Sequence, residues 1–166
     1  FDINAQKLLS QDRDGPREWH FPEIVSAAGW VSEDVLLMAG ERDLFLFDLE
    51  TEEVETLCLL EQDKPKNRPN DGRADPHGGF WIGTMAKDEA AGAGAIYRYY
   101  RGELRKLYND ISIPNAICFP PDGSFAHFSD TVTHKVMKVT VDADGWPNAA
   151  PEVFLDLSDE GLYPDG

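Results

Sequence analysis

The sequence predicts an all-β chain built from β-propeller blades, because short motifs and apolar runs both recur about every 45 residues. The motifs are Asn70-Asp71-Gly72, Pro114-Asn115-Ala116 and Pro164-Asp165-Gly166, in which Asn115 follows Asn70 by 45 residues and Asp165 follows Asn115 by 50. A propeller blade takes roughly 40–50 residues, so a side chain with this period returns to one place in successive blades. We expect that place to be the central channel.

Strand-like runs follow the same period. The apolar runs 35–39, 80–84 and 125–129 start 45 residues apart. Each is followed by two further runs of apolar, β-branched and aromatic residues, and Gly, Pro and Asp punctuate the sequence between them. These further runs are 43–48, 54–59, 95–100, 104–108, 135–140 and 152–157. Each unit is therefore predicted to be strand, turn, strand, turn, strand.

The repeats describe one partial domain over residues 1–166, with approximate blade repeats 25–69, 70–114 and 115–164. Propellers close with whole blades, typically about 4–8 of them, and these repeats are too few to close one. We therefore expect the chain to be part of a longer protein. Its open blade faces would leave apolar surface uncovered, which predicts self-association of the isolated segment.

Charge excludes some partners. The chain has 31 acidic against 15 basic residues, a net charge of −16, and no basic cluster. Nucleic acids and anionic membranes both depend on Lys and Arg contacts, so neither is expected as a partner. No apolar run approaches the roughly 20 residues that span a bilayer.

Cys58 and Cys118 lack metal-type spacing and lie in strand-like runs, which predicts buried thiols and a reducing, cytoplasmic location.

A longer pattern brings a family resemblance. Residues 67–76 read NRPNDGRADP and residues 79–85 read GFWIGTM, and further matching segments lie at 113–117, 121–130 and 161–166. The pattern resembles the gluconolactonase, regucalcin and luciferin-regenerating family of six-bladed propellers, and is most similar to its bacterial sugar-lactone hydrolases. The resemblance implies a six-bladed propeller of which this chain supplies about three and a half blades.

The resemblance also implies one divalent metal ion in the channel, held by a Glu, an Asn and an Asp. Asn115 matches the Asn and Asp165 the Asp, whereas the Glu belongs to a motif that precedes Phe1 in relatives. Glu18 is not assigned to that role. Oxygen ligands suit calcium, manganese, zinc or iron(II), and such an ion can activate water and polarise an ester carbonyl. Asp165 would also accept the proton of the attacking water.

Three further residues match the substrate contacts of the family: Arg68, Asn70 and Asp88. Arg68 and Asn70 would hydrogen-bond sugar hydroxyls or the lactone oxygen. The loop from Lys87 to Gly94 around Asp88 has small residues that suit a lid over the channel mouth.

Other polar and aromatic residues receive structural interpretations. Asp71 and Asp75 are predicted to close a turn, and Asp130 to bond backbone at a strand end. The histidines lack the mutual spacing of a zinc site. The four tryptophans are predicted to pack between blades or beside turns: Trp19, Trp30, Trp81 and Trp146.

The leading hypothesis is a metal-dependent hydrolase that opens a sugar lactone to its aldonic acid. The alternative is a non-catalytic calcium-binding regulatory protein of the regucalcin type. A bare propeller scaffold for partner proteins is a third possibility, and it predicts no metal affinity.

Overall fold

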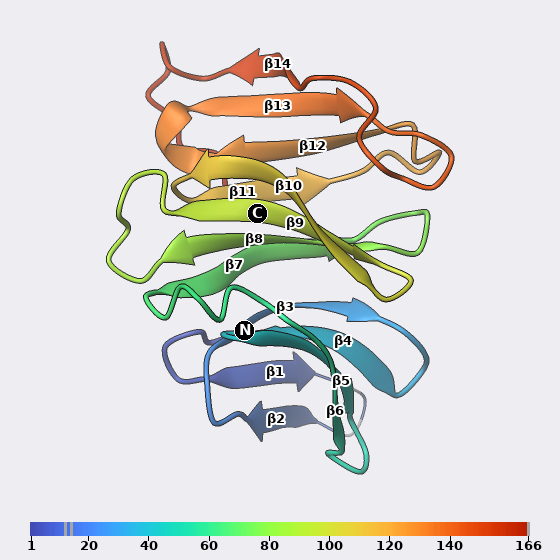
Figure 1. The fold of residues 1–166 in the computed structure, drawn as a ribbon. Coiled ribbons are helices and arrows are strands. Elements are labelled where there is room, and N and C mark those ends of the chain that lie inside the picture. Colours follow the sequence, from blue (N-terminus) through green and yellow to red (C-terminus); the bar gives the residue numbers. More distant parts are fainter. Residues whose placement is uncertain (12, 14, 166) are drawn as a thin grey trace.

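The computed structural model describes residues 1–11, 13 and 15–165, and these form 14 strands and one short 3-10 helix. Three sheets have four antiparallel strands each, in sequence order, and a fourth has two (Figure 1). The strands are β1 (Lys7–Gln11) and β2 (Pro16–His20); β3 (Val25–Trp30), β4 (Val35–Gly40), β5 (Asp43–Asp48) and β6 (Val54–Leu59); β7 (Asn67–Ala74), β8 (Phe80–Ala86), β9 (Gly94–Tyr100) and β10 (Glu103–Ile111); β11 (Pro114–Cys118), β12 (Phe125–Asp130), β13 (Lys135–Thr140) and β14 (Glu152–Asp156).

The predicted all-β fold is confirmed, and every apolar run at the 45-residue period is a strand. The prediction of three strands per unit was wrong, because each complete sheet has a fourth strand at its start. These first strands are β3, β7 and β11. The last two, β7 and β11, contain the recurring motifs. Pro, Asn and Gly are typical of turns, so these motifs did not predict strands.

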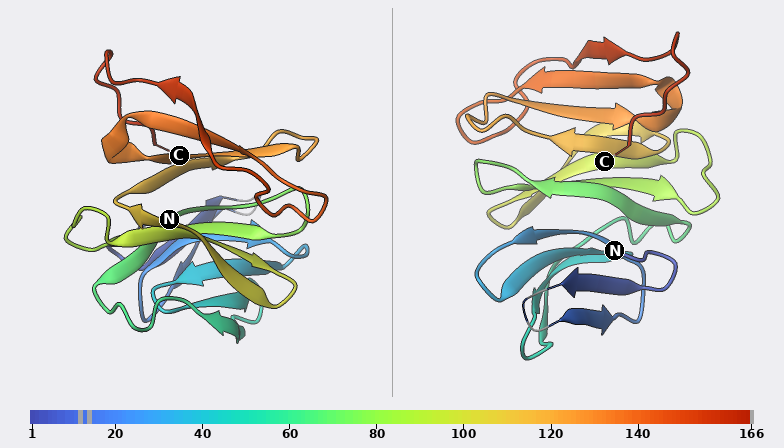
Figure 2. Two further views of the ribbon diagram at one scale, coloured as in Figure 1. Left: turned by 45° about the horizontal axis from the view of Figure 1, so that its top comes forward. Right: turned by 180° about the vertical axis from the view of Figure 1, so that it is seen from behind.

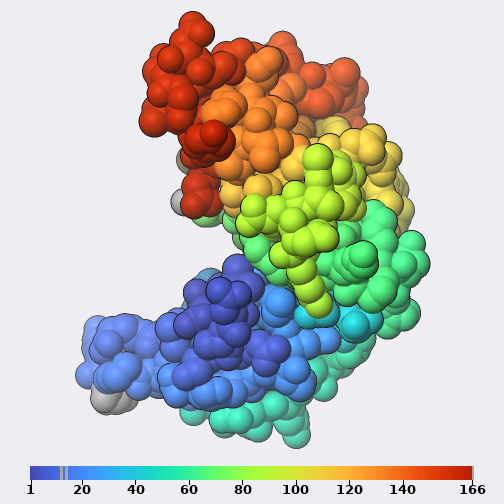
Figure 3. All heavy atoms as spheres, turned by 90° about the vertical axis from the view of Figure 1, so that its left-hand side faces the viewer, coloured from blue at the N-terminus to red at the C-terminus, as the bar shows by residue number. Residues whose placement is uncertain are grey.

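The sheets succeed one another as blades do, with β7 beside both β3 and β11 (Figures 1 and 2). The space-filling view shows the chain as an open, curved body that is hollowed on one side (Figure 3). Gly83 on β8 permits close approach of the third sheet, because a Cβ at this position would overlap the ring of Pro114 at the start of β11. The chain therefore supplies part of a propeller, with β3, β7 and β11 as neighbouring inner strands. The division into repeats 25–69, 70–114 and 115–164 stays a proposal.

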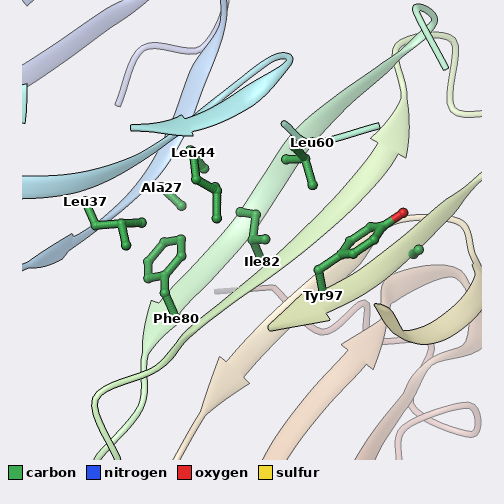
Figure 4. Close-up of a cluster of buried hydrophobic side chains, with 9 residues drawn as sticks. Ala27, Leu37, Leu44, Leu60, Phe80, Ile82 and Tyr97 are labelled. Carbon is green, nitrogen blue, oxygen red and sulfur yellow. The ribbon is translucent and has the colours of Figure 1, made fainter. Parts of the chain in front are cut away.

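Apolar clusters fill the spaces between sheets. Between the first and second four-stranded sheets, Leu44 and Ile82 are fully buried and Tyr97 lies at the edge of the cluster (Figure 4). A second cluster joins β1 and β2 to the first four-stranded sheet. A third lies between the second and third four-stranded sheets and contains Trp81 and Phe128. Burial of this apolar surface is the main force that holds the blades together.

One expectation about burial was wrong, the one for Cys118. Trp30 lies at the end of β3, beside the bend that leads to β4, and is 68% exposed, whereas Trp19 and Trp81 are buried. Cys118 is exposed, since it ends β11 at a bulge. On β14 the side chains of Val153, Phe154 and Leu155 are about half exposed. Self-association through such a face stays a prediction. In the described part of the chain, no helix is long and apolar enough to cross a membrane.

Candidate functional site

The two recurring asparagines lie on β-bulges of neighbouring inner strands. The pairing of β7 with β8 shifts register between Pro69 and Gly72, around Asn70. The pairing of β11 with β12 shifts between Asn115 and Cys118, and Ala116 there has a left-handed φ of 56°. A bulge bends a strand and re-aims its side chains, and bulges are common beside functional sites. The 45-residue period thus places two carboxamides at equivalent bulges.

Asp71 ties these two bulges together. Its Oδ2 accepts a hydrogen bond of 2.9 Å from the backbone N–H of Ile117. The prediction that Asp71 helps to close the turn at residues 76–79 was wrong, because its carboxylate binds the backbone of the next sheet. Asp75 does close its turn, since its Oδ1 accepts from the N–H groups of His77 and Gly79 at 2.9 Å each.

A continuous row of hydrogen bonds runs from Arg68 across the two bulges. Arg68 Nη1 donates to Asn70 Oδ1 at 2.9 Å, and Asn70 Nδ2 donates to Asn115 Oδ1 at 2.9 Å. Asn115 Nδ2 then donates to Thr131 Oγ1 at 2.8 Å. Thr131 Oγ1 donates to the carbonyl oxygen of Pro164 at 2.8 Å. We call Arg68, Asn70, Asn115, Thr131 and Pro164 the polar row.

Burial and a further backbone hydrogen bond hold the polar row in place. Asn115 is 7% exposed, and Asn70 Nδ2 makes a second hydrogen bond of 2.9 Å to Pro114 O. Burial lowers the pKa of Arg68 from its ordinary value, and the nearby carboxylate of Glu89 opposes that shift. Arginine stays protonated in proteins, so Arg68 supplies a positive charge at one end of the row.

Asp165 follows the last member of the polar row. It is exposed and lies in the segment after β14 that has no regular secondary structure. The hydrogen bond from Thr131 to Pro164 O anchors that segment one residue away from Asp165. The structure therefore joins the backbone before Asp165 to the side chain of Asn115 through one hydroxyl group.

Asp88 lies in a different environment from the polar row. It is exposed in the connection between β8 and β9, where it lines a shallow depression with Lys64 and Asn67. The connection is fixed at both ends, by a 2.9 Å bond from Lys87 N to Lys66 O and a 3.1 Å bond from Gly92 N to Ser112 Oγ. Within this loop it is Glu89 whose charge acts on Arg68.

The donor atoms near the polar row fit a hard divalent cation. Asn115 Oδ1 accepts one hydrogen bond in the row, and a carbonyl oxygen has two lone pairs. Together with the Asp165 carboxylate it offers the oxygen ligands that such ions prefer. Among the described residues, no group of three or more His, Cys, Asp and Glu side chains could hold a metal ion. Glu18 on β2 is engaged elsewhere, with Lys7 and His20.

Sequence reasoning missed Thr131 and Glu89. Thr131 begins the 3-10 helix η1 (Thr131–Thr133) directly after Asp130. The backbone role predicted for Asp130 is confirmed, because its two carboxylate oxygens accept from Ser112 N and Ile113 N at 2.9 Å. Thr131 carries no periodic signal, since it lies outside the inner strands. Its only sequence signal is its place after an Asp that ends a strand.

The chain is similar to one family of known proteins over its whole length. A family model described as an SMP-30/Gluconolactonase/LRE-like region matches residues 1–166. A putative sugar lactone lactonase of Rhizobium meliloti (strain 1021) is 44% identical over 131 residues, which cover 78% of this chain and 43% of the relative. The 6-deoxy-6-sulfogluconolactonase of Pseudomonas putida is 29% identical over 170 residues, 99% of this chain and 58% of that protein.

Among solved structures, a calcium-binding protein, regucalcin, from Agrobacterium tumefaciens superimposes with a TM-score of 0.91. It is 40% identical, and the match covers 95% of this chain and 54% of that one. The chain thus spans about half the length of the relatives it matches. The predicted resemblance is confirmed over the whole sequence.

Proposed function

Because the chain belongs to the SMP-30/gluconolactonase/LRE-like family, we propose that the protein it forms hydrolyses a sugar lactone to the corresponding aldonic acid. The supporting observation is the polar row, which brings Arg68, Asn70 and Asn115 together from two neighbouring inner strands. Relatives named as lactonases of sugar lactones support the same reaction class. A cyclic ester needs an activated water and stabilisation of the carbonyl oxygen, and little else, to open.

We assign Asn115 Oδ1 and the Asp165 carboxylate as ligands of one divalent metal ion, with calcium, manganese, zinc and iron(II) all compatible with oxygen donors. When bound, such an ion supplies Lewis-acid polarisation of the ester carbonyl and acidifies water. Asp165 accepts the proton of the attacking water. Its exposed position in the segment after β14 suits a base that must exchange protons with solvent.

The substrate contacts follow from hydrogen-bond capacity. Arg68 is a cation and donates to the lactone oxygen or to sugar hydroxyls. Asn70 uses both Nδ2 hydrogens within the protein, toward Pro114 O and Asn115 Oδ1. It can therefore add a hydrogen bond only as an acceptor, at Oδ1, and a sugar hydroxyl is the natural donor. Asp88 is the third proposed contact, as an acceptor on the loop between β8 and β9.

A second candidate function is calcium binding without catalysis. The specific observation in its favour is the 40% identical structural relative, which is described as a calcium-binding protein. The two candidates share the metal ligands Asn115 and Asp165. They differ in whether a lactone is turned over.

The test uses the protein expressed from its complete gene, with proton release from aldonolactones followed at constant pH. We expect turnover that chelation abolishes and divalent metal restores. Asn115→Ala should lower kcat/KM by about 100-fold. Mutation of a residue that only hydrogen-bonds a metal ligand typically lowers activity by about 10–100-fold, and loss of a ligand itself lowers it at least as much. Asn148→Ala is the matched control, since Asn148 is exposed and bonds Thr140 Oγ1 on the third sheet.

Wild-type activity in Asn115→Ala would overturn the proposed site. Calcium binding by the wild-type protein with no turnover of any aldonolactone would favour the second candidate.

A further inference from the structure

We propose that Thr131 is a positioning residue, whose hydroxyl sets which atom of the Asn115 carboxamide faces the proposed metal site and couples Asn115 to the segment that carries Asp165. The inference rests on the proposed function for its catalytic readout only. Its structural basis is the direction of each hydrogen bond in the polar row.

The direction is fixed first from the Pro164 end. The carbonyl oxygen of Pro164 can only accept, so Thr131 must donate its one hydroxyl hydrogen along that 2.8 Å contact. Thr131 Oγ1 then faces Asn115 as an acceptor. Asn115 must present Nδ2 there, at 2.8 Å, because two acceptors would repel. Its Oδ1 consequently points the other way.

The direction is fixed again, independently, from the Arg68 end. The guanidinium can only donate, so Asn70 must turn Oδ1 toward Arg68 Nη1, 2.9 Å away. Asn70 Nδ2 therefore faces Asn115 and can only donate. Asn115 must meet it with Oδ1, at 2.9 Å. Both ends of the row thus demand the same orientation of the Asn115 carboxamide.

All donors in the row consequently point from Arg68 toward Pro164, so the bond dipoles add and each bond polarises the next. Two hydrogen bonds fix the orientation of the Asn115 carboxamide: Nδ2 donates to Thr131, and Oδ1 accepts from Asn70. Asn115 Oδ1 accepts only one bond in the row. It keeps a lone pair for a cation, whereas the flipped amide would present an N–H group, which repels a cation. Loss of the Thr131 hydroxyl removes one of the two groups that prevent this flip.

Thr131 is itself well placed for this role. Its backbone N–H donates to Ile113 O at 2.9 Å, and the preceding Asp130 clamps Ser112 N and Ile113 N. The hydroxyl position is therefore fixed by the backbone just before β11, the strand that carries Asn115. The hydrogen bonds between residues 130–131 and residues 112–113 therefore hold Thr131 close to Asn115.

The experiment compares Thr131→Val, which keeps the shape and removes the hydroxyl, with Thr131→Ser, which keeps the hydroxyl. Thr133→Val is the matched control, because Thr133 lies in the same short helix and bonds Asp130 O outside the polar row. Binding of Ca²⁺ and Mn²⁺ to the protein from the complete gene is measured by calorimetry. The side-chain amide signal of Asn115 is followed by NMR, and lactone hydrolysis is measured over a range of metal concentrations.

We expect Thr131→Val to weaken metal binding by about 10-fold, the low end for outer partners of a metal site. Thr131→Ser and Thr133→Val should bind metal as the wild type does. Excess metal should restore hydrolysis by Thr131→Val, which a general loss of packing would not allow. The Asn115 amide signal should shift in Thr131→Val and return in Thr131→Ser, with or without metal.

Wild-type metal affinity and an unchanged Asn115 amide signal in Thr131→Val would overturn the role of Thr131. If the wild type binds metal but opens no lactone, the proposed function fails, while the affinities still decide the role of Thr131. If the wild type binds neither cation, the amide signal alone decides it. The two proposals can therefore fail separately.

Discussion

The two interfaces between neighbouring four-stranded sheets are built differently. The first interface, between the sheets β3–β6 and β7–β10, is mainly an apolar cluster that includes Leu44 and Ile82, both fully buried. The second interface, between β7–β10 and β11–β14, also has apolar packing, but it adds buried polar groups. On the second-sheet side of this interface, Arg98 Nε lies 2.6 Å from Asp75 Oδ2, with the two side chains 0% and 1% exposed. The polar row crosses this second interface as well.

Further contacts reinforce the second interface. The Arg98 guanidinium lies against the rings of both Tyr100 and Trp146, 4.6 and 4.4 Å from their centroids. The ring nitrogens of His77 lie 2.9 and 3.1 Å from the carbonyl oxygens of Gly123 and Ala143. Trp146, Gly123 and Ala143 all belong to loops of the third sheet, whereas Arg98 and His77 belong to the second.

This difference has a physical meaning. Apolar burial is non-directional, so it holds sheets together but tolerates small sliding. Hydrogen bonds demand defined distances and angles, so those that cross from one sheet to the next fix how the two sheets are aligned. Asn70 and Asn115 come from opposite sides of the second interface and must meet within hydrogen-bond distance. We infer that the directional contacts lie where the site needs exact alignment.

The largest effect is expected from Asp75→Asn. This change leaves the Arg98 charge buried without a counterion, and it turns an amide donor either toward Arg98 or toward the N–H groups of His77 and Gly79. We expect a loss of about 4 kcal/mol in the free energy of unfolding, within the range for breaking one partner of a buried ion pair. Denaturant unfolding of the protein from its complete gene measures it.

Glu103→Gln is the matched control for Asp75→Asn. Its partner Arg105 lies 2.9 Å away, but both side chains are about half exposed, and exposed pairs contribute at most about 1 kcal/mol. An equal loss of unfolding free energy in the two variants would show that the buried pair stabilises the fold no more than an exposed pair does. Asp75→Asn should also weaken metal binding, because it loosens the interface that the polar row crosses.

A smaller effect is expected from Leu44→Ala in the first interface. Leu44 is fully buried, and truncation of such a residue costs about 3 kcal/mol through lost burial and the cavity left behind. Metal affinity should stay at the wild-type value, since no member of the polar row lies in this cluster. Val54→Ala on β6, where Val54 is 58% exposed, should change stability by less than about 0.5 kcal/mol.

Leu44→Ala would contradict the comparison if it weakened metal binding as much as Asp75→Asn does. In that case the site would respond to total stability rather than to the alignment of the second interface.

The sequence predicted the features that repeat. Asn70 and Asn115 could be paired because equivalent bulges return every 45 residues, and the apolar runs could be placed because strands bury one face or both. Thr131 could not be found this way, since the equivalent connections after β4 and β8 begin with Glu41 and Lys87, so the residue type does not repeat at this position. The pairing of Asp75 with Arg98 joins residues 23 positions apart, and only the alignment of β7, β8 and β9 brings them together.

The smallest predicted effect concerns Glu61, a carboxylate buried beside the first interface. Glu61 lies in the connection between β6 and β7, with its side chain 4% exposed. Burial opposes ionisation, but hydrogen bonds from Tyr97 at 2.7 Å, Asn67 at 2.8 Å and Lys64 at 3.0 Å outweigh it and lower the pKa of Glu61 from its ordinary value of 4.5. A lowered folded-state pKa means that this stabilisation is present above pH 4.5 and is lost as the pH falls through the lowered value.

Tyr97→Phe removes the 2.7 Å donor and should cost about 1.5–2 kcal/mol at pH 7, the low end for a hydrogen bond to a charged group. The variant's pKa for Glu61 should rise toward its ordinary value, so its acid-induced loss of stability should be smaller than in the wild type, and the difference in stability between the two proteins should shrink as the pH falls. Tyr108→Phe is the matched control, because the buried Tyr108 hydroxyl has no hydrogen-bond partner among the described residues. It should cost nothing at any pH. A pH-independent difference between Tyr97→Phe and the wild type would mean that the tyrosine ring packs the first interface without tuning Glu61.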